Sequence, residues 1–183
     1  MNIDLTRNYF ELFGFTESFE IDQDQLAEKY RTFQSVLHPD RFVNGTDQER
    51  RIAVQTTAFI NKAYETLKSD LKRSHYLLKL SDIEFNADAE TSSDGEFLMQ
   101  TMELHEQVEE VSNASSPQAA LDGLHTLSNQ LKQDQQNLIS QFSDQYRNND
   151  LNAAKETALK LQFYERLSNQ VRKKQEKCEE ELI

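Results

Sequence analysis

Three consecutive residues, His38, Pro39 and Asp40, bring together side chains that serve both in catalysis and in recognition. Histidine can donate and accept a hydrogen bond, an ionised aspartate is a charged acceptor, and the proline between them stiffens the backbone. Three interpretations are open: a turn that ends a helix, a hydrolytic His–Asp pair, or a rigid polar loop that a partner protein recognises. The hydrolytic interpretation is the weakest, because neither a serine nor a cysteine is placed beside the pair as a nucleophile and there is no glycine-rich phosphate loop.

A second group of residues lies between positions 97 and 111. Four apolar residues recur at steps of seven, four and three, which places them on one helix face that should pack inward: Phe97, Leu104, Val108 and Val111. Another face carries one apolar and three acidic side chains, Met99, Glu103, Glu106 and Glu110. Leu98 and Met102 border this face. This second face is either the edge of a wide core stripe with solvated acids, or a docking surface on which flexible apolar side chains contact a partner and carboxylates select a basic one. Periodicity alone favours neither.

Two further signals bear on metal or cluster binding. His105 and Glu109 are four residues apart, a spacing that can hold a metal ion, but no third ligand is evident. Cys178 is the only cysteine, and an iron–sulfur cluster generally needs four protein ligands. We therefore expect Cys178 to pack as a small apolar side chain, and the sequence predicts no metal site, no disulfide and no cofactor.

The charge is unevenly distributed along the 183 residues, whose formal net charge is −12. Residues 1–80 hold 11 Lys/Arg and 12 Asp/Glu, a net of −1, whereas residues 81–183 hold 9 and 20, a net of −11. The acidic excess argues against nucleic-acid binding, and the asymmetry suggests two parts with different partners. No segment approaches the roughly 18 apolar residues of a membrane span, and the first residues lack a leader-peptide pattern. We therefore expect a soluble, cytoplasmic protein with no membrane partner.

The elements that must position these residues are helices. Only four glycines and two prolines occur, and helix-forming residues dominate, so the sequence predicts an all-α fold. Asp22 should cap a helix that ends near His38, because Pro39 disfavours helical geometry in the residue before it. A loop follows, and Thr46 with Glu49 forms the capping-box pattern that starts the next helix.

Two shorter helices are expected at about residues 7–13 and 71–80. The longest of the early helices is expected to face inward along one stripe: Ile52, Phe59, Ala63 and Leu67. Residues 81–95 are polar and should form a linker. Three longer helices follow in residues 96–183, and the short turns between them predict an antiparallel three-helix bundle or a coiled-coil hairpin. The predicted organisation is therefore two small domains, residues 1–80 and 96–183.

Several segments match a known family. They are Tyr9-Phe10-Glu11-Leu12-Phe13-Gly14, the His-Pro-Asp loop continued as Arg41-Phe42, Ile60-Asn61-Lys62-Ala63-Tyr64-Glu65-Thr66-Leu67, Arg73-Ser74-His75-Tyr76-Leu77-Leu78 and Phe97-Leu98-Met99. On these segments, residues 8–80 resemble a J-domain, the module that stimulates ATP hydrolysis by DnaK-type chaperones. The chain as a whole resembles the HscB family, the J-type co-chaperones of iron–sulfur cluster assembly.

The resemblance implies a co-chaperone that is not an enzyme, with an N-terminal J-domain joined to the C-terminal bundle. It implies that the J-domain binds a DnaK-type, HscA-like chaperone through these residues: Lys29, Arg31, His38, Pro39, Asp40 and Arg41. It implies that the bundle binds an IscU-like iron–sulfur scaffold protein through these residues: Leu98, Met99, Met102, Glu103, Glu106, Glu110 and Phe163. An alternative is a J-protein for a different client, with the bundle as a dimerisation arm.

The chain departs from the family pattern at two of these positions. Arg41 stands where lysine is often found, which keeps the charge but changes the hydrogen-bonding geometry. Met102 stands where leucine is often found, and the similar volume should make this change tolerable. Phe163 lies off the apolar seam of the last helix, so we expect it to be an exposed anchor.

Overall fold

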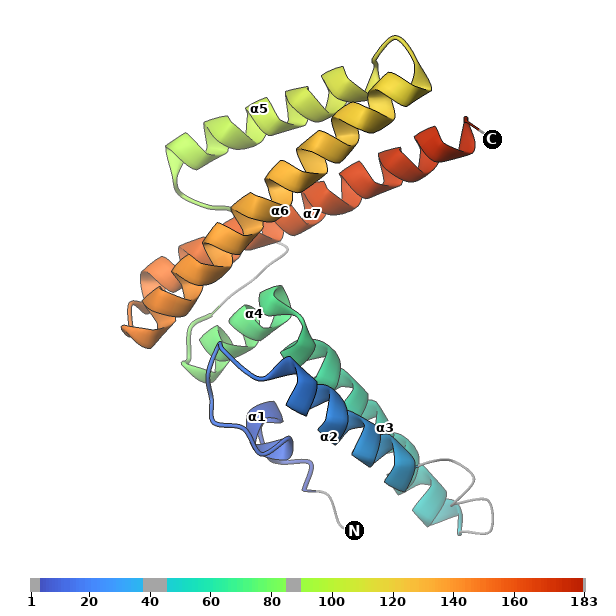
Figure 1. Ribbon diagram of the computed structural model, residues 1–183. Coiled ribbons are helices and arrows are strands. Elements are labelled where there is room, and N and C mark those ends of the chain that lie inside the picture. The colour runs from blue at the N-terminus through green and yellow to red at the C-terminus, as the bar shows by residue number, and fades with distance from the viewer. Residues whose placement is uncertain (1–3, 38–45, 85–89, 183) are drawn as a thin grey trace. The chain divides into compact units, whose positions relative to one another are not determined.

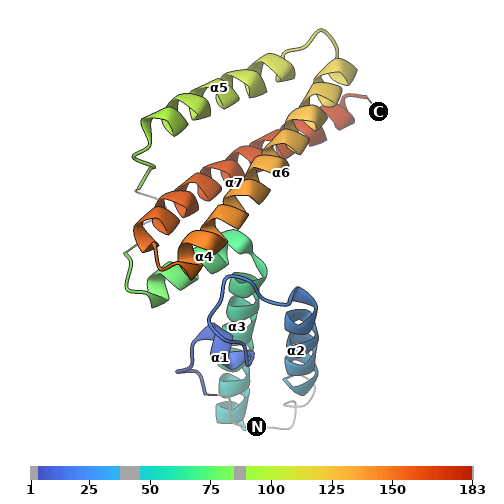
Figure 2. The same ribbon diagram turned by 60° about the vertical axis from the view of Figure 1, so that its left-hand side comes forward.

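The fold is helical throughout the part of the chain that the structure describes. The structure is a computed structural model, and it describes residues 4–37, 46–84 and 90–182. Within these ranges there are seven helices and no strand (Figure 1 and Figure 2), and no helix is long and apolar enough to cross a membrane. The predicted all-α fold is therefore confirmed. The chain divides into two compact units, Met1–Ser81 and Asp82–Ile183.

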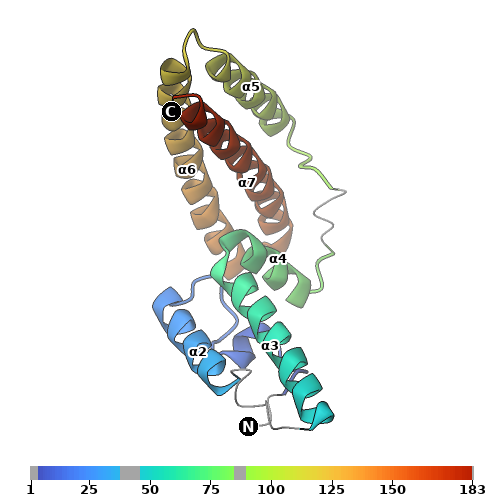
Figure 3. The ribbon, with the colours of Figure 1, turned by 90° about the vertical axis from the view of Figure 1, so that its right-hand side faces the viewer.

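The N-terminal unit contains four helices: α1 (Tyr9–Leu12), α2 (Gln23–Val36), α3 (Asp47–Lys68) and α4 (Asp70–Leu80). α2 and α3 run antiparallel and side by side, and α1 packs against α3 (Figure 1 and Figure 3). Side chains from these three helices fill a core, among them Phe10, Phe13, Leu26, Ile60 and Leu67. Each such large apolar side chain contributes roughly 1.5–3 kcal/mol on burial, so the unit has a core of its own.

Side-chain caps fix where α2 and α3 begin. The Asp22 carboxylate accepts hydrogen bonds from the backbone N–H groups of Asp24 and Gln25 at 3.0 and 2.9 Å, so α2 starts where the sequence predicted. At α3 the backbone N–H of Thr46 donates to the Glu49 carboxylate at 2.7 Å, and the N–H of Glu49 donates to Thr46 Oγ1 at 3.3 Å. This reciprocal pair is the predicted capping box.

The first helix is shorter than predicted. The Asn8 side chain caps it by accepting a hydrogen bond from the Glu11 N–H at 2.9 Å, so α1 starts at Tyr9 rather than near residue 7. The chain turns away at Gly14, whose φ of 63° lies in the left-handed region that glycine adopts readily. Gly14 therefore plays the helix-ending role that the sequence indicated.

The buried face of α3 differs from the predicted stripe at its start. The residues that face inward are Ala53, Thr56, Ile60, Ala63 and Leu67. Ile52, which we expected in this stripe, is 51% exposed, and Phe59 is only half-buried at the edge of the core, 5.5 Å from the ring of Tyr9. The reason is the helical period: alternating steps of four and three back from Leu67 lead to Ala53 and not to Ile52.

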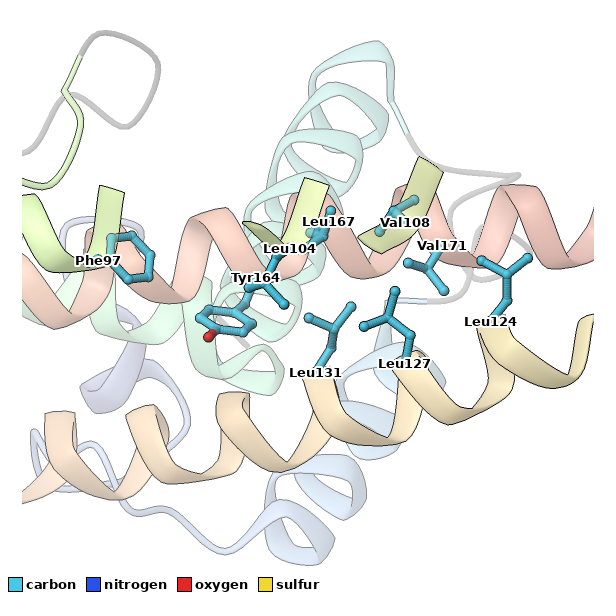
Figure 4. Packing of buried hydrophobic residues seen from close by; sticks show 9 residues of the cluster. All are labelled: Phe97, Leu104, Val108, Leu124, Leu127, Leu131, Tyr164, Leu167 and Val171. Carbon is cyan, nitrogen blue, oxygen red and sulfur yellow. The ribbon is translucent and has the colours of Figure 1, made fainter. Parts of the chain in front are cut away.

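The C-terminal unit is a bundle of three helices: α5 (Gly95–Ser112), α6 (Pro117–Arg147) and α7 (Leu151–Glu180). α6 and α7 form a long antiparallel hairpin, and the shorter α5 packs against both of them (Figure 1 and Figure 3). Figure 4 shows apolar side chains of all three helices meeting between them: Phe97, Leu104, Val108, Leu124, Leu127, Leu131, Tyr164, Leu167 and Val171. Two local predictions are confirmed, since Pro117 follows the Ser116 cap and Cys178 packs against this core.

Candidate functional site

The outward face of α5 exposes three large apolar side chains. Leu98 is 42%, Met99 67% and Met102 66% exposed to solvent, whereas Phe97 and Leu104 are buried. Because an α-helix has about 3.6 residues per turn, the two sets lie on opposite sides of α5. The interpretation of Leu98, Met99 and Met102 as the edge of a wide core stripe is therefore wrong.

Three exposed glutamates, Glu103, Glu106 and Glu110, extend the same face. None of them forms an ion pair with any residue in the described part of the chain. By contrast, Glu109 on the inner edge pairs with Lys174 of α7, with 3.1 Å between Oε1 and Nζ. α5 contains no lysine or arginine, so its outward face carries a net negative charge that favours a cationic partner.

We call this face the α5 surface. It comprises Leu98, Met99, Met102, Glu103, Glu106 and Glu110. It combines flexible apolar side chains with unpaired carboxylates on one side of one helix. An arrangement of this kind can bind a protein segment.

Phe163 on α7 is half-buried rather than the exposed anchor that we expected. Its ring meets the rings of Phe97 and His105 edge-on, with 5.6 Å between centroids in both pairs. Aromatic rings favour this edge-to-face geometry, and α5 lies against α7 here, so the ring is held between the two helices. Phe163 therefore borders the α5 surface instead of standing apart from it.

His105 belongs to this site, although the sequence did not assign it to docking. We had considered it only as a metal ligand with Glu109, but Glu109 bonds to α7 and His105 contacts Phe163. No group of three or more His, Cys, Asp or Glu side chains able to hold a metal occurs among the residues that the structure describes. The spacing could have placed His105 beside the α5 surface, because it is three residues from Met102 and seven from Leu98. Residues at these spacings share one side of a helix.

A polar pocket of about 250 Å³ lies beside the start of α5, with Asp94, Asp134, Lys160 and Tyr164 in its wall. A hydrogen bond from Lys160 holds the pKa of Asp94 below its ordinary value of 3.8. Burial raises the pKa of Tyr164 to about 12, and the negative charge of Asp134 acts in the same direction. Within this pocket, Lys160 and Asp94 form an ion pair with 2.6 Å between Nζ and Oδ2.

The two basic residues assigned to α2 lie on different sides of that helix, because residues two apart do not share a face. Lys29 is half-buried, and its ammonium donates to the Phe13 carbonyl at 2.6 Å and lies 4.4 Å from the centroid of the Phe15 ring. Arg31 is exposed. Lys29 therefore holds the end of α1, while Arg31 offers its charge to solvent.

The His-Pro-Asp loop lies outside the residues that the structure describes. His38, Pro39, Asp40 and Arg41 all belong to the range 38–45, so their assignment stays a prediction. The described elements on either side are the end of α2 and the capped start of α3, which are the two helices that the sequence expected this loop to join.

Comparison with known proteins shows similarity to one family over nearly the whole chain. A family model described as the HSCB C-terminal oligomerisation domain matches residues 93–172. A protein named Co-chaperone protein HscB homolog, from Vibrio cholerae serotype O1, is 39% identical over 176 residues, which cover 96% of this chain and 99% of that relative. A protein of the same name from Shewanella woodyi is 45% identical over 118 residues, 64% of this chain and 68% of the relative.

Solved structures agree with these matches. Chaperone HscB from Vibrio cholerae has a TM-score of 0.83 at 35% identity, covering 94% of this chain and 99% of its own. The human co-chaperone protein HscB has a TM-score of 0.84 at 29% identity, covering 93% and 83%. Both comparisons extend over the N-terminal unit and the bundle together. The chain therefore belongs to the HscB family of co-chaperones, with an N-terminal J-domain joined to a C-terminal three-helix bundle.

Proposed function

We propose that this chain stimulates the ATPase of a DnaK-type, HscA-like chaperone and delivers an IscU-like iron–sulfur scaffold protein to it, which aids the maturation of iron–sulfur proteins. The observation that carries the proposal is the α5 surface, where Leu98, Met99 and Met102 are exposed beside three unpaired carboxylates. A surface of this kind fits a protein partner that has an apolar contact patch and a basic rim.

The α5 surface assigns a different role to each kind of side chain. Leu98, Met99 and Met102 supply apolar contact area, and the unbranched methionines can adjust their shape to the partner. The glutamates select a basic partner and speed its approach. Phe163, held against Phe97, gives the contact a rigid border on its α7 side.

The chaperone contact belongs to the J-domain. Arg31 and Arg41 supply positive charge, and His38, Pro39 and Asp40 engage the ATPase. Lys29 supports this contact from the other side of α2, because its ammonium holds the end of α1 in place. The chain needs no nucleotide or cofactor for this role. It raises the local concentration of the client and biases the chaperone between two states.

An ATPase assay of the chaperone, with and without the scaffold protein, tests both contacts. Asp40→Asn should abolish stimulation, because asparagine keeps the shape of the side chain but loses its charge. Leu98→Ala with Met99→Ala should weaken scaffold binding by about tenfold or more and remove the extra stimulation that the scaffold provides.

Leu182→Ala is the matched control, because Leu182 is 46% exposed in the same unit and lies outside the α5 surface. Normal stimulation by Asp40→Asn at equal concentration would refute the loop assignment. An unchanged scaffold affinity in the Leu98/Met99 variant would refute the client surface.

The matching family model is described as an oligomerisation domain, which supports a second candidate in which the bundle is a dimerisation arm and the client is different. Sedimentation over a range of concentrations separates the two. Our proposal expects one chain of this protein per scaffold chain. A mass that doubles with concentration, and that stays at one chain in the Leu98/Met99 variant, would favour the dimerisation arm.

A further inference from the structure

We propose that Glu156 and Lys160 of α7 are positioning residues for the α5 surface. They fasten the segment Ser92–Asp94, which leads directly into α5, and so fix how α5 lies on α7. This inference rests on the proposed function, since it concerns how the scaffold-binding helix is held in place.

Glu156 is the centre of the first fastening. Its carboxylate accepts three hydrogen bonds: from the hydroxyl of Ser92 at 2.9 Å, and from the backbone N–H and hydroxyl of Ser93, both at 3.2 Å. Ser92 is only 6% exposed, and its hydroxyl also accepts from the Asp94 N–H at 3.1 Å. These residues were expected to form part of a polar linker, and they are instead bonded to the body of the bundle.

Lys160 makes the second fastening, one helical turn further along α7. Its ammonium lies 2.6 Å from Asp94 Oδ2. Asp94 Oδ1 caps α5 by accepting from the N–H groups of Glu96 and Phe97, each at 3.1 Å. One carboxylate therefore starts α5 and ties it to α7 at the same point.

Lys160 also connects this point to the α5 surface. Its ammonium lies 5.2 Å from the centroid of the Phe97 ring, and Phe97 meets Phe163 edge-on. Leu98 and Met99 follow Phe97 directly. A chain of contacts thus runs from Asp94 through Lys160 and the two aromatic rings to the border of the surface.

The packing of the bundle explains why α5 depends on these contacts to stay in place. α5 has three buried residues, whereas α6 has six and α7 has nine, and these two longer helices pack along each other. A helix with so little buried area moves more easily than its neighbours. A partner that binds a mobile helix must also order it, which lowers affinity.

Glu156→Ala tests the inference, because it removes all three acceptor contacts from a residue that is not part of the α5 surface. The free protein should show faster amide exchange in the first two turns of α5. Scaffold affinity, measured by calorimetry, should fall by about tenfold, as expected if the partner must now order that part of α5. Glu156→Gln, which keeps one acceptor oxygen, should give an intermediate result in both measurements.

Glu165→Ala is the matched control, because Glu165 is an exposed glutamate of the same helix and forms no ion pair with a described residue. It should change neither exchange nor affinity. Leu98→Ala with Met99→Ala serves as the reference for direct contact: it should weaken binding without speeding exchange before Leu98.

The outcomes separate the two ideas. If the Leu98/Met99 variant weakens binding but Glu156→Ala does not, the positioning role is refuted while the client surface stands. Unchanged exchange in Glu156→Ala would also refute it, because Glu156 would then not hold α5. If the Leu98/Met99 variant binds the scaffold normally, the client surface itself is refuted, and Glu156 then has no binding surface to position.

Discussion

Arg73 is a charged residue that the J-domain buries almost completely, at 4% exposure. Its guanidinium donates to the carbonyls of Phe19 and Leu67 at 2.6 and 2.5 Å and pairs with Asp70. It also lies 4.8 Å from the Phe19 ring centroid. The fork shape of arginine allows these contacts at once, and burial lowers its pKa without removing its charge. One side chain therefore joins the loop before α2 to the junction of α3 and α4.

Replacing Arg73 by methionine should lower the free energy of unfolding of the J-domain by about 3 kcal/mol, because two buried carbonyls lose their donors. Urea unfolding followed by NMR signals of α2 to α4 measures this loss. Arg50→Met is the control, since Arg50 pairs with Asp47 at the same i,i+3 spacing but is 52% exposed, and it should cost less than about 1 kcal/mol. Equal losses in the two variants would contradict the assigned role.

Tyr164 should titrate late, because its pKa is raised to about 12, first by burial and then by the charge of Asp134. The unfolded chain loses this proton near pH 10, before the folded chain does. The contribution of Tyr164 to the free energy of unfolding is therefore fully present below about pH 10 and is lost as pH rises from about 10 to about 12. An absorbance titration, assigned with Tyr164→Phe, should show the late step, and Asp134→Asn should move it to lower pH. A step that stays in place in Asp134→Asn would show that the carboxylate has no influence.

At the scale of residues, the sequence indicated which side chains belong to the candidate sites but not always what surrounds them. Lys29 and Arg31 were grouped because both are basic and near the loop, yet two residues along a helix they diverge, and only packing shows that Lys29 meets α1. Phe163 was correctly placed off the seam of α7. Its half-buried state depends on α5, which at His105 is 58 residues away along the chain. No local sequence pattern encodes that contact between the two helices.

At the scale of helices, the termini were the most predictable features. Caps at Asp22, Thr46 and Ser116 depend on side chains within three residues, so the sequence contains the whole cause. The buried face of α3 was harder to predict, because Ala53 is small and Ile52 is strongly apolar. Hydrophobicity favoured Ile52, and the helical period together with the neighbouring helices placed Ala53 inside instead.

Gly123 of α6 lies directly against Val111 at the end of α5. A methyl group added there would lie 2.5 Å from Val111 Cγ1, and valine has little rotameric freedom in a helix. Gly123→Ala should therefore destabilise the bundle by about 1–2 kcal/mol, even though alanine is the better helix former by about 1 kcal/mol.

Thermal unfolding of Gly123→Ala, alone and combined with Val111→Ala, tests this contact. The second substitution removes the clashing methyl groups, so the double variant should recover part of the loss. If Gly123→Ala is more stable than the wild type, α5 has room to shift and the contact is not restrictive.

At the scale of the whole molecule, the charge asymmetry now has a structural location. The bundle's acidic excess includes the outward glutamates of α5. Three lysines of α7, at positions 155, 160 and 174, instead form ion pairs with α5 or with the segment before it. Paired and unpaired acids could not be told apart from the sequence, because the pairing partners lie more than 60 residues apart. The family resemblance, by contrast, was readable from short motifs and is confirmed over almost the entire chain.

Scaffold binding should depend on salt, because the unpaired glutamates of α5 are exposed and are screened within about 10 Å at 0.1 M and about 3 Å at 1 M ionic strength. Raising the salt from about 0.05 to about 0.5 M should slow association by roughly tenfold, with a smaller change in dissociation. Surface plasmon resonance measures both rates. In the triple variant Glu103→Gln, Glu106→Gln and Glu110→Gln, the association rate should depend less on salt. If it depends on salt as strongly as in the wild type, these glutamates are not the charges that speed association.

The fastening of α5 to α7 also has a consequence for the order of events during synthesis. The ribosome releases the J-domain first, then α5, then α6, and α7 last, and domains generally fold as they emerge. Until α7 emerges, α5 lacks Glu156, Lys160 and the ring of Phe163, so the α5 surface is without the contacts that hold it. If the proposed function holds, a nascent chain with a folded J-domain cannot yet bind its client, and only a chain that includes α7 can do so.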